Sequence, residues 1–213
     1  AGDISISPEA LSSLPEHISS SVEQKTILTR VFPTDANPGT ELDGCLLPSP
    51  LIYTGETESW VMTADSSGKV SALHPETGAL VWNLILPAPE GEDPVIVATP
   101  ILIQDQLVVG YHTTRTPDGQ AQGVSKHNVM EARIRHRVTV LDLAQRKIDA
   151  NFETLELSAE VPGWDGIGKV RFLPGNSLGR GALIRGLEAG DSMGKVYLTY
   201  GNGRDIQPWH GWA

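Results

Sequence analysis

The chain has 213 residues, of which 39% are apolar and 6% aromatic, with 22 glycines and 15 prolines. Its net charge of −10 at pH 7 repels nucleic-acid phosphates and anionic lipid headgroups, so we expect neither nucleic-acid nor membrane partners. No apolar run approaches the ~20 residues of a membrane-spanning helix, and a single cysteine, Cys45, excludes an internal disulfide.

The N-terminal residues indicate a processed chain. Ala1-Gly2-Asp3 is what cleavage at a small-residue signal-peptidase site leaves behind, although an artificial start would look the same. We therefore expect a secreted or periplasmic protein from which a signal peptide has been removed. Residues 1–25, rich in Ser and Glu, are predicted to form an N-terminal arm, and the β-branched run 26–32 is predicted to be a strand.

Four short apolar runs separated by turn residues follow a loop at 33–47. The predicted strands are residues 49–53, 59–64, 69–73 and 80–84, with turns at 65–68 and 74–78. Four strands of five or six residues joined by tight turns are typical of one antiparallel propeller blade. The first unit is therefore predicted to be such a blade.

The pattern then returns with a long insertion. Ala98–Leu102 repeats the order found in Pro48–Ile52: a small residue, a hydroxyl, a proline and two aliphatics. Predicted strands of this unit are residues 98–102, 107–111, 137–142 and 148–152. The unit is longer than the ~40–45 residues of a usual propeller repeat, and a polar insertion at about 113–132 accounts for the excess.

A third unit begins at residues 181–185 and continues at 194–200, and Trp209–Ala213 should open its third strand. The predicted fold is all-β: about three β-propeller blades of four antiparallel strands, the last incomplete, within a partial propeller at 26–213. The blades are placed at about 48–87, 97–157 and 170–213.

An unfinished blade leaves an unpaired sheet edge and an open apolar face. We expect the missing strands to come from a second fragment of the same precursor, or from a symmetry mate. A self-sufficient three-blade fold is the alternative.

One motif suggests a family. Residues 67–82 (SGKVSALHPETGALVW) resemble the repeat of the propellers related to pyrroloquinoline quinone (PQQ) enzymes. The ending at residues 194–212 resembles a stretch of secreted PQQ-binding-like repeat proteins. The positions that match the repeat are Ala72, Thr77, Gly78 and Trp82. In the second unit Asp142 is kept, but Arg146 stands for the glycine and Ala150 for the tryptophan.

The matched residues have physical roles in such a repeat. Gly78 supplies the left-handed turn residue between strands three and four. Trp82 is predicted to fill the gap between adjacent blades, with its indole N–H bonded to a backbone carbonyl. Ala72 leaves room for that ring.

In a propeller, the loops after strands two and four share one face, and this gathers the candidate ligand-binding residues. They are His112, His127, Trp164, Asp165, Arg204, Asp205, Trp209 and His210. Acidic, aromatic and imidazole side chains around the opening of the central channel predict a small-molecule site there.

Several of these residues have simpler interpretations. His210 is predicted to be structural, and His127 and His136 to be solvated. Asp65 and Asp205 are turn residues before they are calcium ligands. An alternative for His127 is that it binds copper together with Met130, because imidazole and thioether ligands suit that metal.

Three classes of function are compatible with the sequence. The first is a scaffold or a module that binds a ligand or a partner, favoured by the degenerate second repeat. The alternative is part of a quinoprotein-type alcohol oxidoreductase, for which the resemblance implies PQQ and Ca²⁺ as cofactors; the disulfide of adjacent cysteines that many of those enzymes carry cannot form here. An isomerase or lyase is a third class.

The sequence contains no phosphate loop, haem-attachment site, zincin motif or serine elbow. No catalytic residue can be assigned, so the sequence leaves open whether the protein is an enzyme.

Overall fold

The computed structural model of this chain describes residues 39–115, 133–163, 166–187, 194–202 and 211–213. These residues form antiparallel β-sheets, with one short 3₁₀ turn, η1 (Pro174–Asn176). Among them there is no helix with the length and apolarity needed to span a membrane. The predicted all-β class is confirmed.

The first sheet is a four-stranded meander. Its strands are β1 (Leu51–Thr54), β2 (Ser59–Ala64), β3 (Lys69–Leu73) and β4 (Leu80–Ile85), paired in chain order, which confirms the predicted strands of the first unit to within two residues at either end. The turns explain this agreement. The carboxylate of Asp65 accepts the backbone N–H of Ser67 at 2.8 Å, and Gly78 has a φ of +68°, as predicted for a left-handed turn residue.

The middle sheet is built on one long hairpin. β7 (Gln106–Arg115) and β8 (Arg133–Asp142) pair over ten residues. β5 (Asp93–Val95) and β6 (Ile101–Ile103) pair with the outer edge of β7, and β9 (Lys147–Ile148) and β10 (Leu155–Glu156) with that of β8. The predicted insertion therefore starts later than expected, because its first residues continue β7.

The predicted fourth strand at 148–152 is wrong. Only Ile148 of that range lies in a strand. The carboxylate of Asp149 accepts the backbone N–H of Asn151 at 2.8 Å, and the carbonyl of Asp149 accepts the N–H of Phe152 at 3.2 Å. This local turn competes with the sheet ladder, so pairing with β8 resumes only at β10.

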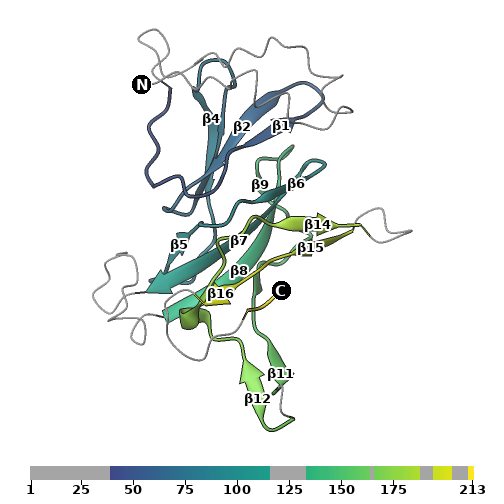
Figure 1. The fold of residues 1–213 in the computed structure, drawn as a ribbon. Coiled ribbons are helices and arrows are strands. Elements are labelled where there is room, and N and C mark those ends of the chain that lie inside the picture. Colours follow the sequence, from purple (N-terminus) through teal and green to yellow (C-terminus); the bar gives the residue numbers. More distant parts are fainter. Residues whose placement is uncertain (1–38, 116–132, 164–165, 188–193, 203–210) are drawn as a thin grey trace, which may run out of the picture.

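Three two-stranded pairs complete the described structure. β11 (Glu160–Pro162) pairs with β12 (Lys169–Arg171), β13 (Ser177–Leu178) with β16 (Gly201–Asn202), and β14 (Ile184–Gly186) with β15 (Lys195–Tyr197). The last pair is a shortened form of the two strands predicted for the third unit. The β11–β12 hairpin, which the sequence analysis missed, projects from the rest of the molecule (Figure 1).

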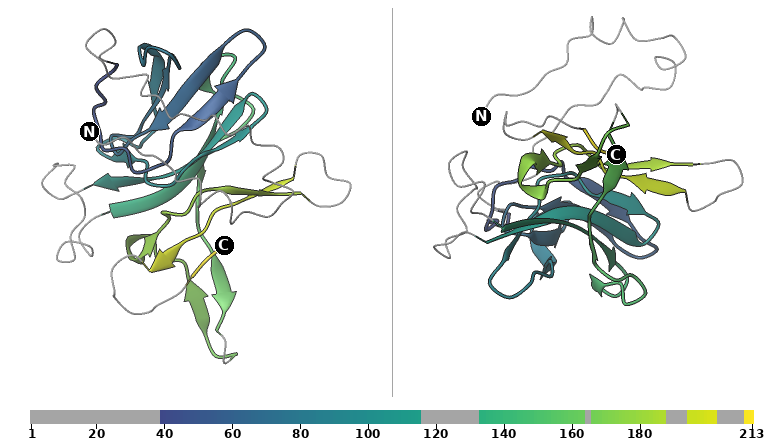
Figure 2. Two further views of the ribbon diagram at one scale, coloured as in Figure 1. Left: turned by 45° about the horizontal axis from the view of Figure 1, so that its top comes forward. Right: turned by 90° about the horizontal axis from the view of Figure 1, so that it is seen from below.

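The middle sheet is covered on both faces. Alternating residues of β7 point to opposite sides: Leu107 and Val109 join a cluster with the first sheet, whereas Val108 packs in a second cluster with Leu183 and Val196 of the β14–β15 hairpin region. Figure 2 shows β14 and β15 as a separate layer on the middle sheet. The order of layers is thus first sheet, middle sheet, β14–β15 hairpin.

Trp82 lies in the cluster between the first and middle sheets, with 9% of its surface exposed. Its ring meets the ring of Trp60 edge to face, with centroids 5.7 Å apart, and Ala72 is its cross-strand partner. The predicted hydrogen bond from its indole N–H to a carbonyl is wrong: Nε1 has no partner among the described residues. The ring is held by apolar and edge-to-face contacts instead.

Candidate functional site

Only one of the eight predicted ligand-binding residues, His112, lies in the described structure. His127, Trp164, Asp165, Arg204, Asp205, Trp209 and His210 all lie outside the described residues. The predicted small-molecule site at the channel opening therefore stays a prediction, and only the surroundings of His112 can be described.

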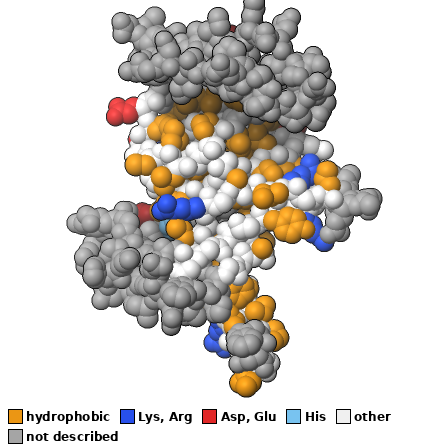
Figure 3. Space-filling model, viewed as in Figure 1, with side chains coloured by type: hydrophobic (Ala, Val, Ile, Leu, Met, Phe, Trp, Pro, Cys, Tyr) orange, Lys and Arg blue, Asp and Glu red, His pale blue; other side chains and the backbone are white. Residues whose placement is uncertain are grey.

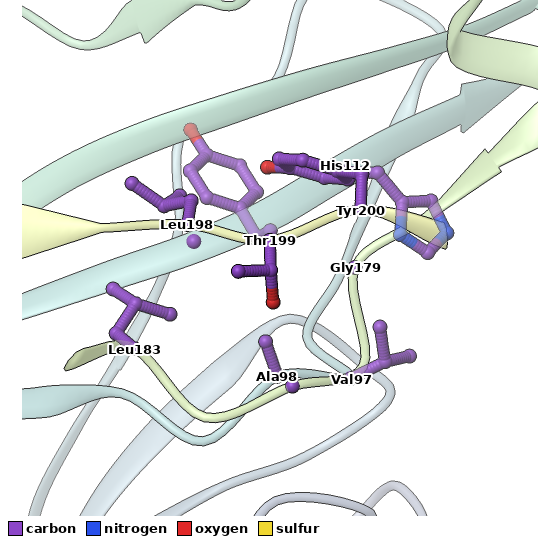
Figure 4. Close-up of a pocket in the computed structure, with 11 residues that line it drawn as sticks. Val97, Ala98, His112, Gly179, Leu183, Leu198, Thr199 and Tyr200 are labelled. Atoms are coloured by element: carbon purple, nitrogen blue, oxygen red, sulfur yellow. The ribbon is translucent and has the colours of Figure 1, made fainter. Parts of the chain in front are cut away.

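His112 stands near the end of β7 and lines a small pocket with Gly179, Leu198 and Tyr200 (Figure 4). The pocket has a volume of about 10 Å³, which is room for no more than one water molecule. The ring of His112 lies 5.8 Å from the ring of His136, its cross-strand partner on β8.

His136 is a buried anchor, which corrects the prediction that it is solvated. Only 3% of its surface is exposed. Its Nε2 lies 3.1 Å from the carbonyl oxygen of Pro174 and 3.0 Å from that of Ser177. Both carbonyls accept, so Nε2 carries a proton that it shares between them. Burial lowers the pKa of the imidazole.

The reason for the error is the length of β8. The predicted strand began at Arg137, whereas the observed strand begins at Arg133. With the longer strand, His136 falls two residues before Val138 and so shares its face of the sheet, which is covered by the third layer. The alternation of Ile134, His136 and Val138 along the strand is the sequence pattern that could have predicted the burial of His136.

The ring of His136 contacts the rings of His112, Phe172 and Tyr200, and Phe172 in turn contacts Trp212. We call these five residues the aromatic cluster. Tyr200 lies 4.8 Å from His136, and Phe172 lies 5.3 Å from Tyr200 and 5.7 Å from Trp212, all in edge-to-face geometry. Burial raises the pKa of Tyr200 to about 12. The cluster joins strand ends that are far apart in the sequence, so sequence reasoning did not find it.

A groove opens beside the aromatic cluster along β15, and we call it the β15 groove. Its lining includes Leu157, Ala159, Val196 and Leu198, and the rings of Phe172 and Trp212. Its volume is about 240 Å³. The groove is lined mainly by apolar side chains, which suits contact with another apolar surface.

A charged network lies at the same end of the middle sheet, on residues that alternate with His112 and His136 along β7 and β8 and so belong to its other face. The buried carboxylate of Glu92 accepts the hydroxyl of Thr113 at 2.6 Å and faces Arg135 at 3.2 Å. Glu156 pairs with Arg135 at 2.7 Å and with Arg137 at 3.1 Å. Because each arginine here faces a carboxylate, the network ties β5 and β10 to the central hairpin.

Within the described part of the chain, no three histidine, cysteine or acidic side chains converge on one point. Asp65, weighed above as a turn residue or a calcium ligand, accepts hydrogen bonds from the N–H groups of Ser67 and Lys69 at 2.8 and 3.4 Å, which fits the turn. A scan against protein-family models and a search of curated proteins find no match to this sequence.

Proposed function

We propose that this chain is a scaffold whose sheets are successive blades of a propeller-like stack, and that its function is to bind a second polypeptide. The proposed partner supplies further sheets of the same stack and comes from the same precursor. The PQQ-like motif at residues 67–82 supports the comparison with propeller repeats, because its turn glycine and its buried tryptophan take the positions that such a repeat needs.

The observation that carries the proposal is an apolar face of the third layer that no other described element covers. The inner face of the β14–β15 hairpin region is buried against the middle sheet through Leu183 and Val196. On the opposite face, the cross-strand partners Ile184 and Tyr197 are 60% and 43% exposed, and Leu187, just after β14, is 67% exposed. Figure 3 shows hydrophobic and basic side chains gathered in this region. An exposed apolar face of this kind marks a protein-binding surface.

The kind of partner follows from the two covered interfaces. In each of them a sheet face built from one repeat packs on a face built from the next repeat. A stack of this type buries its core only through its neighbours. A further blade-like sheet therefore fits the exposed face of β14–β15.

The test is the mass of the protein isolated under mild conditions from the cells that make it. We expect native mass spectrometry to find a complex that contains this 22.9 kDa chain and a second polypeptide. The variant Ile184→Lys should release the second polypeptide, because it places a charge on the exposed face. Ile167→Lys, which charges an isoleucine that is 79% exposed on the β11–β12 turn, should keep it.

Two results would overturn the proposal. One is a homogeneous monomer of 22.9 kDa. The other is quinone absorbance together with calcium-dependent dye reduction in the presence of alcohols, PQQ and Ca²⁺, which would establish the oxidoreductase alternative.

A further inference from the structure

His136 fastens one layer of the structure to another. It stands on β8 of the middle sheet, and its Nε2 lies 3.1 Å from the carbonyl oxygen of Pro174 in η1 and 3.0 Å from that of Ser177 in β13. β13 in turn pairs with β16. We call residues 174–178 the η1–β13 segment, and this imidazole binds it to the middle sheet.

The surroundings of this imidazole suit its neutral form. Its hydrogen bonds in the described part of the chain are both made by Nε2, so a second proton goes to Nδ1, for which the described residues supply no acceptor. The residue is buried, and the rings of Phe172 and Tyr200 lie 5.5 and 4.8 Å from its own. A charge added here therefore loses its hydration without gaining a partner.

A second imidazole adds repulsion to this cost. His112 is the cross-strand partner of His136, and the two rings lie 5.8 Å apart. Histidine gains its charge between pH 8 and pH 5, so acid places two like charges side by side on this face of the middle sheet. Tyr200, whose pKa burial raises to about 12, stays neutral throughout this range.

The other charged groups nearby lie on the opposite face of β8. Arg135 and Arg137 alternate with His136 along the strand, and the carboxylates of Glu92 and Glu156 that pair with them lie on their side. Residues 174–178 contain no titratable side chain. The elements packed on His136 in the described structure thus bring no carboxylate to its ring that would compensate a positive charge.

We propose that His112 and His136 form an acid-sensitive latch, which holds the η1–β13 segment and the aromatic cluster on the middle sheet at neutral pH and releases them in acid. The device works within the chain and goes beyond the proposed function. Because Phe172, Tyr200 and Trp212 line the β15 groove, release also takes this groove apart. The first sheet, which packs on the other face of the middle sheet, stays in place.

The direction of the pH effect follows from the burial of His136. Burial lowers the pKa of the imidazole below its ordinary value of 6.5, so the open form takes up a proton more readily than the closed form. Below pH 6.5, each proton taken up on opening favours the open form about tenfold per pH unit, until the pKa of the closed form is reached. Above pH 6.5 the latch stays closed.

Hydrogen exchange of the 213-residue chain at pH 8 and pH 5 tests the latch. Each rate is divided into that of an unstructured peptide at the same pH, which gives a protection factor. The amides of Tyr200 and Trp212, which bond to each other's carbonyls at 2.9 Å, report on the aromatic cluster. Their protection should fall about tenfold or more at pH 5. The amide of Leu86, bonded to the carbonyl of Gly68 at 2.9 Å, should stay the better protected at both values.

Three variants identify the groups responsible. His136→Gln keeps an N–H donor for the two carbonyls but does not titrate, so Tyr200 and Trp212 should keep their protection at pH 5. His112→Gln removes the repulsion and should reduce the loss of protection. His74→Gln, at an exposed histidine, is the control and should behave like the unmodified chain. Circular dichroism at pH 8 checks that each variant folds, and His112→Gln gives a separate measure because it leaves the contacts of His136 in place.

Three results would overturn the latch. The amides of Tyr200 and Trp212 could keep their protection at pH 5. They could show the same protection as Leu86 at both pH values, which would mean that they open only when the whole chain unfolds. The loss of protection could also be the same in both histidine variants, His112→Gln and His136→Gln, as in the unmodified chain. The proposed function is tested separately, by the native complex.

Discussion

The hydroxyl oxygen of Thr99 accepts a hydrogen bond from the backbone N–H of Ser49 at 2.9 Å. The carbonyl oxygen of Thr99 accepts a second one, from the N–H of Leu183 at 3.0 Å. Ser49 and Thr99 occupy the same position in the repeated segment before strand one, and Leu183 stands just before β14. One residue of the middle unit thus joins the starts of all three layers.

We expect Thr99→Val to lower the free energy of unfolding by about 1 kcal/mol, because it removes the hydroxyl acceptor and keeps the shape of the side chain. Thr99→Ser retains the acceptor and should lie between Thr99→Val and the unmodified chain. Urea unfolding followed by fluorescence measures both. Equal stability of the valine variant and the unmodified chain would show that the Ser49 contact contributes nothing.

Arg146 combines a strained backbone with a contact between sheets. It has a φ of +55° at the position where the resemblance places glycine, its guanidinium lies 5.2 Å from the centroid of the Trp60 ring, and it pairs with Glu58 at 3.2 Å. Arg146→Ala should be destabilising, because it loses both contacts and keeps the strain. Arg146→Gly loses the same contacts but relieves the strain, and should be about 1 kcal/mol more stable than Arg146→Ala. Thermal unfolding of the two variants gives the order, and the reverse order would contradict the argument.

His136 should make stability depend on pH. Burial lowers the pKa of its imidazole below the ordinary value of 6.5, so the unfolded chain takes up a proton first as the pH falls. Stability from this group is complete above pH 6.5 and is lost as the pH falls from there toward the lower pKa of the folded state, by up to about 1.4 kcal/mol per pH unit. Urea unfolding between pH 8 and pH 5 measures this slope.

The variant His136→Gln identifies the source of that slope, because glutamine keeps an N–H donor for the carbonyls of Pro174 and Ser177 but does not titrate. It should unfold with a smaller dependence on pH than the unmodified chain. His74→Gln, a change at an exposed histidine, serves as the control and should keep the full slope. If His136→Gln keeps the full slope as well, His136 is not the group responsible.

Two turn glycines of the first sheet should differ in their tolerance of alanine. Gly78 and Gly68 have φ values of +68° and +75°, so alanine at either position adopts a strained backbone at a cost of about 1 kcal/mol. A Cβ atom on Gly68 would in addition lie 2.6 Å from the carbonyl oxygen of Pro94, in β5 of the middle sheet. Gly68→Ala should therefore be clearly the more destabilising in denaturant unfolding. Equal losses would show that the first and middle sheets are not packed closely at this turn.

The first sheet could be predicted well because its determinants are local. The turn at Asp65–Gly68 is closed by hydrogen bonds within five residues, and Gly78 supplies a conformation that few other residues adopt. Apolar residues two apart then give the pairing register. The end of the predicted strand after Ile148 could not be seen, because Asp149 and Asn151 can enter either a strand or a turn until the neighbouring strands are known.

The sequence by itself determined the all-β class, the four strands of the first sheet and the left-handed turn at Gly78, since these depend on residues that are neighbours in the chain. The tertiary structure alone decided that His136 is buried, that Trp82 is held without a hydrogen bond to its indole, and that Phe172, Tyr200 and Trp212 meet beside β15. Those outcomes depend on which faces of distant strands are covered, and burial by a partner 38 residues away, as between His136 and Pro174, leaves no mark in the local pattern of residues.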